Sequence, residues 1–301
     1  MILVSVVTLV YNHAPYLRQC LDGFIMQQCN FEFEVLINDD ASTDGSAEII
    51  REYEEKYPDI IKPIYQTENQ YSKGGRVNVR FNFPRAKGKY IAMCEGDDFW
   101  TDPLKLQKQV DFLEQAPDFV LSFHNTGTVD EHGKILLESR LNYDSDRDFE
   151  PAYINMIHIP TLSMVFRNHC IDPEKFPKVF NGDIFLVGLL SKFGKARYQH
   201  FNGANYRKHA GGVYSSSHSL KRHKDSLKSR ELLLTFLPSD LQLSVRRRMN
   251  NFYSNLLNEL LAQKKIKEFV KYQWQFLQNC RKQMNLKPWT DYQKTLIRRI
   301  F

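Results

Sequence analysis

Hydrophobic positions in the first 125 residues follow two alternating patterns. Short runs rich in β-branched residues predict buried strands at 4–10, 33–37, 60–65, 90–94 and 119–123. Between these runs the apolar residues recur at helical spacing. Pro15 suits the first turn of the first helix, because its missing N–H costs nothing there. The alternation indicates an α/β fold with a mostly parallel sheet flanked by helices.

Polar residues mark where the helices begin. Ser42, Thr43 or Asp44 is expected to cap a helix that runs to about residue 57, and another helix should begin at 101–103. A weaker helix is predicted to run to residue 86, and Pro84 near its end should bend or end it.

Beyond residue 125 the pattern is looser. Residues 126–160 predict a hairpin and a long loop, 161–166 a strand, and 183–193 a helix. Residues 212–224 are typical of a mobile linker, and the remainder predicts helices with two apolar stripes. The first stripe comprises Val245, Met249, Phe252, Tyr253, Leu256, Leu257, Leu260 and Leu261; the second comprises Ile266, Phe269, Val270, Phe276, Leu277 and Cys280.

The composition is that of a globular protein. Of the 301 residues 42% are hydrophobic and 25% charged, which excludes a disordered chain, a collagen-like repeat and a coiled-coil rod. The apolar opening MILVSVVTLV is too short for a membrane span and lacks the basic start of a secretory signal, so we interpret it as a buried strand. The five cysteines include no CxxC pair, which suits a reducing, cytoplasmic location without a disulfide framework or zinc site.

Charge divides the chain into an acidic body and a basic tail. Residues 1–216 contain 23 Lys and Arg against 29 Asp and Glu, a net charge of −6, whereas residues 217–301 contain 18 against 6, a net charge of +12. Such a tail fits nucleic acid, an anionic membrane leaflet or an anionic partner. A solvated helical face is an equally good interpretation of the charge alone.

Acidic residues follow two predicted strands at the point where each strand ends. The second strand runs into Asn38-Asp39-Asp40 and the fourth into Glu95-Gly96-Asp97-Asp98. Ligands of an open parallel sheet bind beyond the carboxyl ends of its strands. Three carboxylates within four residues repel one another unless a cation lies among them, and oxygen ligands suit Mg²⁺ or Mn²⁺ bridging to phosphates. Helix capping by Asp97 or Asp98 is the simpler alternative, but Asp102 serves that purpose better.

Three segments together resemble the opening of family-two glycosyltransferases with the GT-A fold. They are VSVVTLVYN, EVLINDDASTDGS and GKYIAMCEGDDFWTDPLKLQKQV, and the resemblance extends over about residues 1–215. It implies a GT-A-type, Rossmann-like catalytic domain at 1–215, with a nucleotide-binding part at 1–125 and an acceptor part at 126–215. Residues 216–301 would then form a basic helical C-terminal region. The family transfers a sugar from a nucleotide-sugar to an acceptor with inversion at the anomeric carbon.

The resemblance also assigns residues to the donor site. Tyr11 and Asp40 should contact the nucleotide base. Asp97 and Asp98 match the metal-and-ribose motif, with Asp98 the expected ligand of Mn²⁺ or Mg²⁺. The sequence departs from the usual motifs in two places: Glu95 stands where Asp is commoner, and Ala41 replaces Gly. Neither change removes a carboxylate.

Further residues are assigned in the same way. Asp183 matches the segment that supplies the family's catalytic base, although a carboxylate in a first helical turn is also favourable beside the helix dipole. His209 lies in a stretch similar to the family's YRxHxGG segment and is expected to bind the cation, while neighbouring Arg207 or Lys208 would pair with phosphate. Arg76 and Arg80 are candidates for contacts with the base or phosphate. For Trp100 the sequence does not choose between sugar stacking and a core position.

The leading hypothesis is therefore a metal-dependent inverting glycosyltransferase. Its donor would be a nucleoside-diphosphate sugar, UDP-linked as in most of the family, and its acceptor a glycan or lipid-linked saccharide in surface polysaccharide synthesis. A sugar-nucleotide-forming nucleotidyltransferase would want a glycine-rich loop after the first strand, where Tyr11-Asn12-His13-Ala14-Pro15 stands instead. A non-catalytic membrane- or nucleic-acid-binding module leaves the acidic clusters unexplained.

The basic tail suggests a peripheral contact with the inner face of the cell membrane. Its charge of +12 accompanies aromatic residues such as Trp289 and the ending Leu296-Ile297-Arg298-Arg299-Ile300-Phe301. A homodimer interface would explain the two apolar stripes equally well. We expect no nucleic-acid partner for the whole chain.

Overall fold

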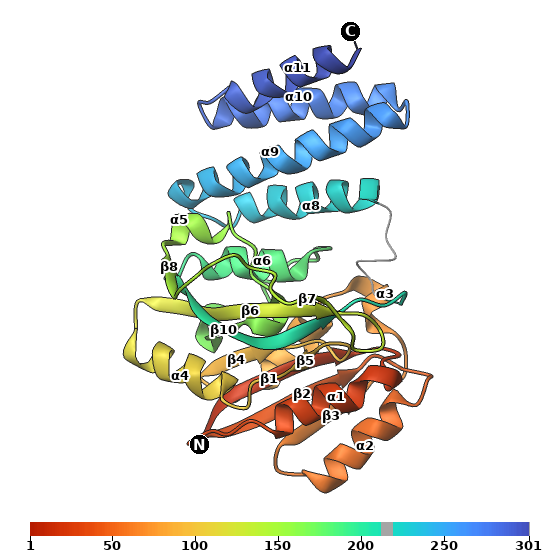
Figure 1. The fold of residues 1–301 in the computed structure, drawn as a ribbon, viewed down its shortest axis with the longest axis vertical. Helices are drawn as coiled ribbons and strands as arrows, with labels where there is room; N and C mark the ends of the chain where they lie inside the picture. The colour runs from red at the N-terminus through yellow and green to blue at the C-terminus, as the bar shows by residue number, and fades with distance from the viewer. Residues whose placement is uncertain (212–218, 301) are drawn as a thin grey trace. The chain divides into compact units, whose positions relative to one another are not determined.

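The computed structural model describes residues 1–211 and 219–300, which form two compact units (Figure 1). The first unit contains Met1–Glu150, His158–Val179 and 193–211. The second contains Pro151–Ile157, Phe180–Lys192 and 219–300. Two segments from before residue 215 therefore lie with the C-terminal helices, and the second of them includes Asp183.

One half of the sheet in the first unit is parallel. Its strands are β1 (Ile2–Val10), β2 (Glu32–Asp39), β3 (Ile61–Tyr65) and β4 (Tyr90–Met93), in the spatial order β3-β2-β1-β4. These are the first four predicted strands, extended or trimmed by a few residues at their ends. Their β-branched runs are buried on both faces, as parallel strands covered by helices require.

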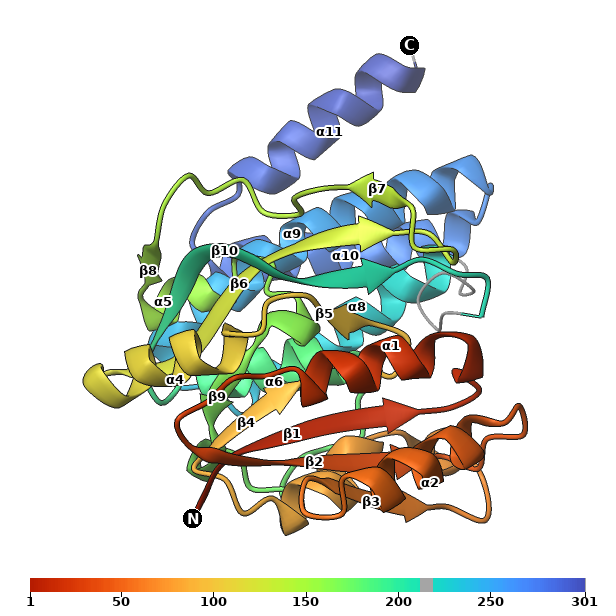
Figure 2. The same cartoon turned by 60° about the horizontal axis from the view of Figure 1, so that its bottom comes forward.

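The other half of the sheet is mixed. Beyond β4 the order continues with β9 (Val165–Arg167), β6 (Phe119–Val129), β10 (Lys195–Arg207) and β5 (Phe99–Trp100). Strands β6 and β10 run parallel and side by side (Figure 2), whereas β9 and β5 are antiparallel to their neighbours. At the margin, β7 (Ile135–Leu137) pairs with β6 and β8 (Arg147–Phe149) with β10. The predicted α/β fold is confirmed, but β5 and β10 were not predicted, and the strand expected at 161–166 begins only at Val165.

Helices flank this sheet. They are α1 (Ala14–Ile25), α2 (Ser46–Lys56), α3 (Gln70–Gly74) and α4 (Lys105–Gln115). Pro15 lies in the first turn of α1, as predicted. The weak helix expected up to residue 86 is broken into α3, a π-turn at Asn78–Asn82 and a 3₁₀ turn at Phe83–Arg85. Further 3₁₀ turns lie at Thr161–Ser163 and Asn168–Cys170.

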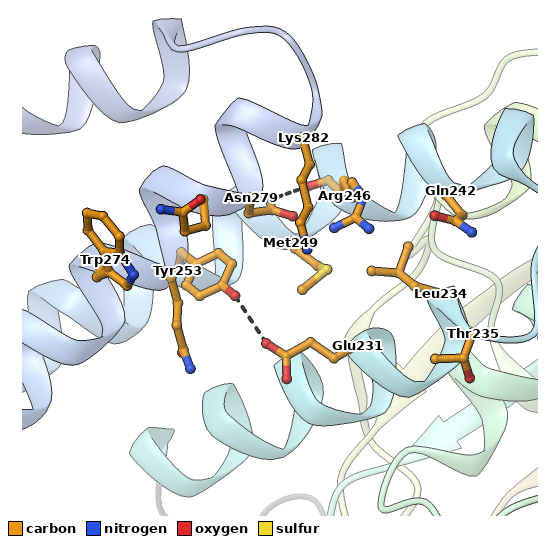
Figure 3. Close-up of a pocket in the computed structure, with 12 residues that line it drawn as sticks. Glu231, Leu234, Thr235, Gln242, Arg246, Met249, Tyr253, Trp274, Asn279 and Lys282 are labelled. Atoms are coloured by element: carbon orange, nitrogen blue, oxygen red, sulfur yellow. Dashed lines mark hydrogen bonds between the residues drawn. The ribbon is translucent and has the colours of Figure 1, made fainter.

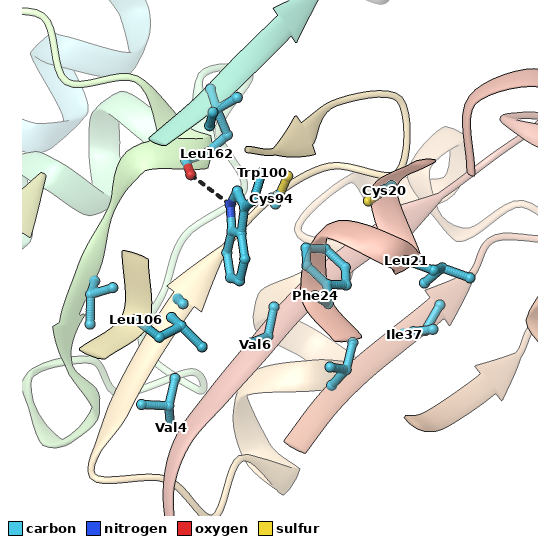
Figure 4. Packing of buried hydrophobic residues seen from close by; sticks show 14 of the residues in the cluster. Val4, Val6, Cys20, Leu21, Phe24, Ile37, Cys94, Trp100, Leu106 and Leu162 are labelled. Atoms are coloured by element: carbon cyan, nitrogen blue, oxygen red, sulfur yellow. Dashed lines mark hydrogen bonds between the residues drawn. The ribbon is translucent and has the colours of Figure 1, made fainter. Parts of the chain in front are cut away.

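The core of the first unit lies between the sheet and its helices (Figure 4). Val4 and Val6 of β1 are fully buried there, and Phe24 of α1 packs edge-on against Trp100 with 4.8 Å between ring centroids. The Trp100 indole N–H donates to the carbonyl of Leu162 at 2.9 Å. Trp100 is therefore a core residue with its polar atom satisfied, and it is not a sugar-stacking platform.

The second unit is helical. It contains α5 (Pro151–Ile154), α6 (Gly182–Leu190), α8 (Ser219–Leu234), α9 (Ser239–Ala262), α10 (Ile266–Lys282) and α11 (Lys287–Ile300). The linker predicted at 212–224 is corrected from residue 219 onward, because 219–224 form the first turns of α8. Residues 212–218 lie outside the described residues. Among the described residues no helix is long and apolar enough to span a membrane.

The two predicted apolar stripes differ in their burial. Most of the first stripe is buried on α9. On α10 only Phe276 and Cys280 of the second stripe are buried, while Ile266 and Val270 are 55% and 61% exposed. The packed side of α10 is completed by Asn279, which donates to Arg246 and Asn250 on α9. The buried face of α10 is therefore narrower than the apolar stripe that its sequence predicts.

Candidate active site

The loops after β1 and β2 are joined by hydrogen bonds. The Asn12 amide donates to Ser42 Oγ at 2.9 Å, and Asn12 Oδ1 accepts from the Thr43 amide at 2.8 Å. Asp44 accepts from the Ala14 amide at 2.9 Å and from the Ser46 amide at 3.0 Å. The N-cap of α2 is Gly45, which has no side-chain cap, so none of the three predicted residues takes that position; Asp44 lies just before it and accepts from Ser46 in the first turn. The carboxyl ends of these two strands meet, as the parallel sheet predicts.

The predicted base-contacting residues lie at these strand ends. Tyr11 is 44% exposed just after β1. Asp40 is fully buried, and its two carboxylate oxygens accept from the amides of Gln70 and Tyr71 at 2.7 and 3.0 Å. Asp40 therefore fixes the start of α3. The sequence did not predict this contact. Its neighbour Asp39 is buried too, and burial raises the pKa of that carboxyl.

The loop after β4 passes close to the end of β1. The Gly96 amide donates to the Leu9 carbonyl at 3.1 Å. A Cβ on Gly96 would lie 2.9 Å from Val10 Cγ2 and 3.0 Å from His13 Nδ1, so only glycine allows this approach. The approach brings the acidic loop 95–98 against the segment that follows β1.

Two histidines gather on Asp97. His209 Nε2 lies 3.0 Å from Asp97 Oδ2, and His13 Nε2 lies 3.8 Å from the same oxygen. Burial raises the pKa of Asp97, but the hydrogen bond from His209 and the nearby His13 outweigh it and hold that pKa below its usual value. Burial lowers the pKa of His13. The Tyr16 ring packs 4.8 Å from the His209 ring, which fixes its orientation.

Asp98 is more deeply buried than Asp97. It is 3% exposed, and its Oδ1 accepts from the Arg207 amide at 2.8 Å. Burial raises the pKa of Asp98 well above its usual value, and the neighbouring Asp97 and Glu95 raise it further. The charges of Glu95 and Asp97 therefore act on the Asp98 carboxyl.

Arg207 connects the segments around these carboxylates. Its guanidinium donates to the carbonyls of Asp97, Asp130 and Glu131 and to Gln19 Oε1, and it lies over the rings of Tyr16 and Phe99. With these contacts and an exposure of 3%, the group has a structural role and is not available to pair with phosphate. Of the two cations predicted for that contact, Lys208 is the exposed one.

The other predicted arginines, Arg76 and Arg80, contact residues outside this cluster. Arg76 has a left-handed backbone with φ of 60° and donates through Nη1 to the Phe176 carbonyl. Arg80 is exposed, and its guanidinium lies 4.9 Å from the centroid of the Phe81 ring. Neither has a hydrogen bond or ion pair to Asp40, Asp97 or Asp98 within the described part of the chain.

Asp183 belongs to the second unit. It lies in the first turn of α6, where Asn181 is the N-cap residue. The start of α6 is held by α8, because the Asn181 amide donates to Ser229 Oγ at 3.4 Å and its Oδ1 accepts from Ser226 Oγ at 3.3 Å. The Asp183 side chain is exposed, but the surrounding protein raises the pKa of its carboxyl by desolvation, and hydrogen bonds from the backbone amides of Ile184 and Asp183 oppose this shift in part.

The donor set of the cluster suits a divalent cation. Within residues 1–211 and 219–300, no three His, Cys, Asp or Glu side chains form a complete metal site on their own. A nucleotide-dependent Mn²⁺ or Mg²⁺ needs only one or two carboxylates from the protein and takes further oxygens from phosphates. Asp97 and His209, which lie 3.0 Å apart, offer a carboxylate and an imidazole beside the carboxylate of Asp98, and this chemistry fits an ion that takes its other ligands from phosphates.

The structure thus brings Asp97 and His209 into contact, with Asp98 the next residue in the chain. Sequence reasoning missed the contributions of His13 and Tyr16. No pattern in the sequence indicated them, because His13 reaches Asp97 through the close approach at Gly96 and Tyr16 lies within α1.

Comparison with known proteins now identifies the family. Residues 5–172, more than half of the chain, match the model of glycosyl transferase family 2. The chain belongs to this family. The predicted resemblance to family-two glycosyltransferases is confirmed.

Sequence relatives of this family-2 glycosyltransferase occur in several bacteria. An uncharacterized protein of Mycobacterium tuberculosis is 36% identical over 219 residues, which cover 72% of this chain and 62% of that protein. This chain therefore spans less than two thirds of that relative. The Escherichia coli enzyme WfaP, named as a UDP-Glc:alpha-D-GlcNAc-diphosphoundecaprenol beta-1,3-glucosyltransferase, is 27% identical over 232 residues, covering 75% of this chain and 86% of WfaP.

Solved structures show the same fold. S. aureus TarS 1–349 in complex with UDP-GlcNAc superposes with a TM-score of 0.70 at 17% identity, covering 92% of this chain and 81% of TarS 1–349. The mannosyltransferase PcManGT of Pyrobaculum calidifontis, in complex with GDP-Man and Mn²⁺, superposes with a TM-score of 0.55 at 14% identity, covering 92% of this chain and 84% of PcManGT. These similarities establish the GT-A fold for this family-2 glycosyltransferase.

Proposed function

We propose that this family-2 glycosyltransferase is an inverting, metal-dependent enzyme that moves a sugar from a UDP-linked donor to a glycan or lipid-linked saccharide acceptor in surface polysaccharide synthesis. The observation that carries the proposal is the contact between Asp97 and His209 beside the buried Asp98. The name of the E. coli relative, with its UDP-linked donor and lipid-linked acceptor, supports the choice of substrates.

In this proposal the chain divides its tasks. Residues 1–125 bind the nucleotide, 126–215 complete the acceptor side, and 216–301 form a basic helical region. Tyr11 and Asp40 lie at the strand ends that would bind the base. Asp40 would contribute by holding the start of α3 through its two hydrogen bonds. Arg76 and Arg80 remain proposed contacts to the base or phosphate.

Departure of the nucleoside diphosphate needs positive charge beside the phosphates. Mn²⁺ or Mg²⁺ held by Asp98, Asp97 and His209 would neutralise that developing charge when bound. His13 and Tyr16 orient the carboxylate and the imidazole through the contacts described above. Arg207 keeps Asp98 in place through its backbone amide.

Asp183 is the proposed general base. The acceptor oxygen forms a bond to the anomeric carbon as the bond from that carbon to the diphosphate oxygen breaks, and the hydroxyl proton passes to the Asp183 carboxylate. A carboxyl with a raised pKa is a stronger base than an ordinary aspartate, which suits this role.

A release assay with a panel of nucleotide-sugars tests the donor half of the proposal. With Mn²⁺ and no acceptor, the full chain should liberate nucleoside diphosphate. Asp97→Asn and Asp98→Asn should each reduce this rate by about 100-fold or more. Asp59→Asn, an exposed carboxylate far along the chain from the cluster, is the matched control and should leave it unchanged. Release of pyrophosphate from a nucleoside triphosphate and a sugar phosphate would instead indicate a nucleotidyltransferase.

The base assignment has a separate test. Asp183→Asn should bind the donor with unchanged affinity by calorimetry and lose transfer to an acceptor. Transfer at a near-normal rate by this variant would show that another group accepts the proton.

We also propose that the basic helical region rests on an anionic membrane surface. Lys264, Lys265, Lys267 and Lys271 are exposed and form no ion pair with any described residue. They flank Ile266 and Val270, the exposed apolar residues of α10. Apolar side chains beside lysines are typical of helices that lie in a membrane interface.

A further inference from the structure

The helical unit contains a pocket of its own between α8, α9 and α10 (Figure 3). Its volume is about 490 Å³, within the usual range for small-molecule sites. Apolar surface from Leu234, Met249, Tyr253 and Trp274 is combined there with several polar side chains. None of these residues belongs to the transfer machinery described above.

Two buried oxygen atoms in this lining lack hydrogen-bond donors. Asn279 is 4% exposed, and its Nδ2 donates to the Arg246 carbonyl at 2.9 Å and to Asn250 Oδ1 at 2.8 Å. These two acceptors fix the orientation of the amide, so its other atom is the oxygen. Asn279 Oδ1 has no donor within the described residues, and neither has the buried Gln275 Oε1. A buried acceptor without a donor is costly, and a ligand that supplies hydroxyl hydrogens would remove that cost.

Cations outnumber acids around the same pocket. Arg246 and Lys282 line it, and neither forms an ion pair with a described residue. The one acid among the lining residues is Glu231, which accepts from the Tyr253 hydroxyl at 3.2 Å. The pocket therefore favours a ligand with negative charge.

An aromatic side chain lies exposed at this pocket. Trp274 lines it and is 58% exposed, an uncommon state for a tryptophan on a helix that has a buried face. The Arg281 guanidinium lies 5.9 Å from its ring centroid. The flat apolar face of an indole packs well against the C–H groups of a sugar ring.

From these observations we propose that the pocket binds an acidic saccharide, a glycan segment that carries carboxylate or phosphate groups. Its hydroxyl groups would donate to Asn279 and Gln275, its anionic group would pair with Arg246 and Lys282, and a ring would pack on Trp274. A simple phosphate would pair with the cations but has no ring to pack on Trp274. The inference goes beyond the proposed transfer reaction, because binding here requires neither a nucleotide donor nor a metal ion.

Calorimetry on the full chain without nucleotide or metal tests the site. The probes are oligogalacturonate, a phosphorylated mannan oligomer, neutral maltohexaose and inorganic phosphate. We expect saturable binding of at least one acidic oligosaccharide, weaker binding of maltohexaose and phosphate, and a change in tryptophan fluorescence. Trp274→Ala and Arg246→Gln should each lower the affinity for the acidic oligosaccharide by about tenfold or more.

Matched variants decide the outcome. Lys267→Gln removes an exposed cation of α10 that does not line the pocket and should leave the affinity unchanged, whereas Lys282→Gln should lower it. Trp274→Ala, at an exposed position, should keep the melting temperature and the nucleotide-sugar hydrolysis rate of the parent. The proposal is overturned if neither acidic oligosaccharide binds, if Trp274→Ala and Arg246→Gln bind as tightly as the parent, or if phosphate alone binds equally well.

Discussion

Ala41 adopts a backbone conformation that suits glycine. Its φ of 63° lies in the left-handed region, where the Cβ of an alanine crowds the following carbonyl at a cost of about 1–2 kcal/mol. The family motif usually has glycine at this position, and the structure gives the physical reason. The loop after β2 keeps its shape here because its hydrogen bonds to Asn12 and Ala14 hold it.

Replacing Ala41 with glycine should therefore stabilise the first unit. We expect Ala41→Gly to raise the free energy of unfolding by about 1 kcal/mol, since relief of strain exceeds the extra entropy of an unfolded glycine. Urea denaturation measures the change. Gly45→Ala is the converse control, because Gly45 has a φ of 95° and should lose stability as alanine. A lower stability of Ala41→Gly would contradict the strain argument.

Lys105 is a fully buried amine in α4. Its Nζ donates to Gln109 Oε1 at 2.9 Å and lies 4.1 Å from the centroid of the Trp100 ring. Burial lowers the pKa of Lys105 from 10.5 to about 7. Between those values the unfolded chain binds this proton and the folded chain does not, so stability should rise with pH from about 7 to about 10.

The slope attributable to this residue should reach at most about 1.4 kcal/mol per pH unit. Urea denaturation at pH 7, 8 and 9 measures it as the difference between the parent and Lys105→Met, which cannot titrate. Lys87→Met, at an exposed lysine, should follow the pH dependence of the parent. If Lys105→Met shows the same slope as the parent, the amine is protonated in the folded protein.

At the scale of elements, one glycine sets the contact between β1 and β4. Gly88 lies just before β4, and its amide donates to Ser5 Oγ at 2.9 Å. A Cβ at this position would lie 2.5 Å from the Ser5 nitrogen and 2.7 Å from the Val4 carbonyl carbon. Both are backbone atoms of β1, which cannot move without shifting the strand.

Gly88→Ala should therefore lower the free energy of unfolding by about 1–3 kcal/mol, the usual cost of overpacking. Chemical denaturation measures the loss. Gly182→Ala is the matched control, because no atom lies within 4 Å of the position that a Cβ would take there and the residue begins α6. Equal stability of Gly88→Ala and the parent would mean that β1 and β4 separate easily.

The parallel half of the sheet could be predicted because each strand carries its own signal. Strands β1, β2 and β4 are short apolar runs followed by acidic or polar residues, so both the elements and Asp40, Asp97 and Asp98 follow from local pattern. Strand β10 has no such signal, since it reads KARYQHFNGANYR and its small and polar residues are weak strand formers. Pairing with β6 makes it a strand, and such long-range pairing is absent from local sequence.

The cluster on Asp97 shows the same limit within the site. That His209 meets Asp97 was expected only from the family resemblance. That His13 also meets it depends on the close approach at Gly96, which no spacing along the chain reveals. Arg207 looked like a ligand for phosphate because it is a cation in a site motif, but its burial and its carbonyl partners come from separate segments of the chain.

At the scale of the whole molecule, the opposite charges of the two parts of the chain have a measurable consequence. The membrane proposal predicts that the full chain floats with vesicles containing anionic phospholipid and not with neutral vesicles, and that added salt weakens this binding. Replacing Lys264, Lys265, Lys267 and Lys271 together with glutamine should reduce flotation by at least about tenfold, at roughly 1 kcal/mol per lysine.

A control variant with four other lysines replaced distinguishes the effect of where the charges lie from the effect of total charge. Changing Lys56, Lys62, Lys87 and Lys192 to glutamine removes the same charge outside residues 264–271 and should leave flotation nearly unchanged. Equal loss in both variants would mean that only net charge matters. Flotation unaffected by either would favour the homodimer interpretation of the helices, which sedimentation analysis would then reveal.

The position of β10 in the sheet also bears on synthesis of the protein. Strands β1 to β4 pair with one another and are complete once residue 93 has left the ribosome. Among the strands that the structure describes, β5, at residues 99 and 100, pairs with β10 alone, and β10 ends at residue 207. At about 5–20 residues per second, translation leaves the nascent β5 without its neighbour for roughly 5–20 s. Chaperone contacts and cotranslational misfolding should therefore concentrate on this interval.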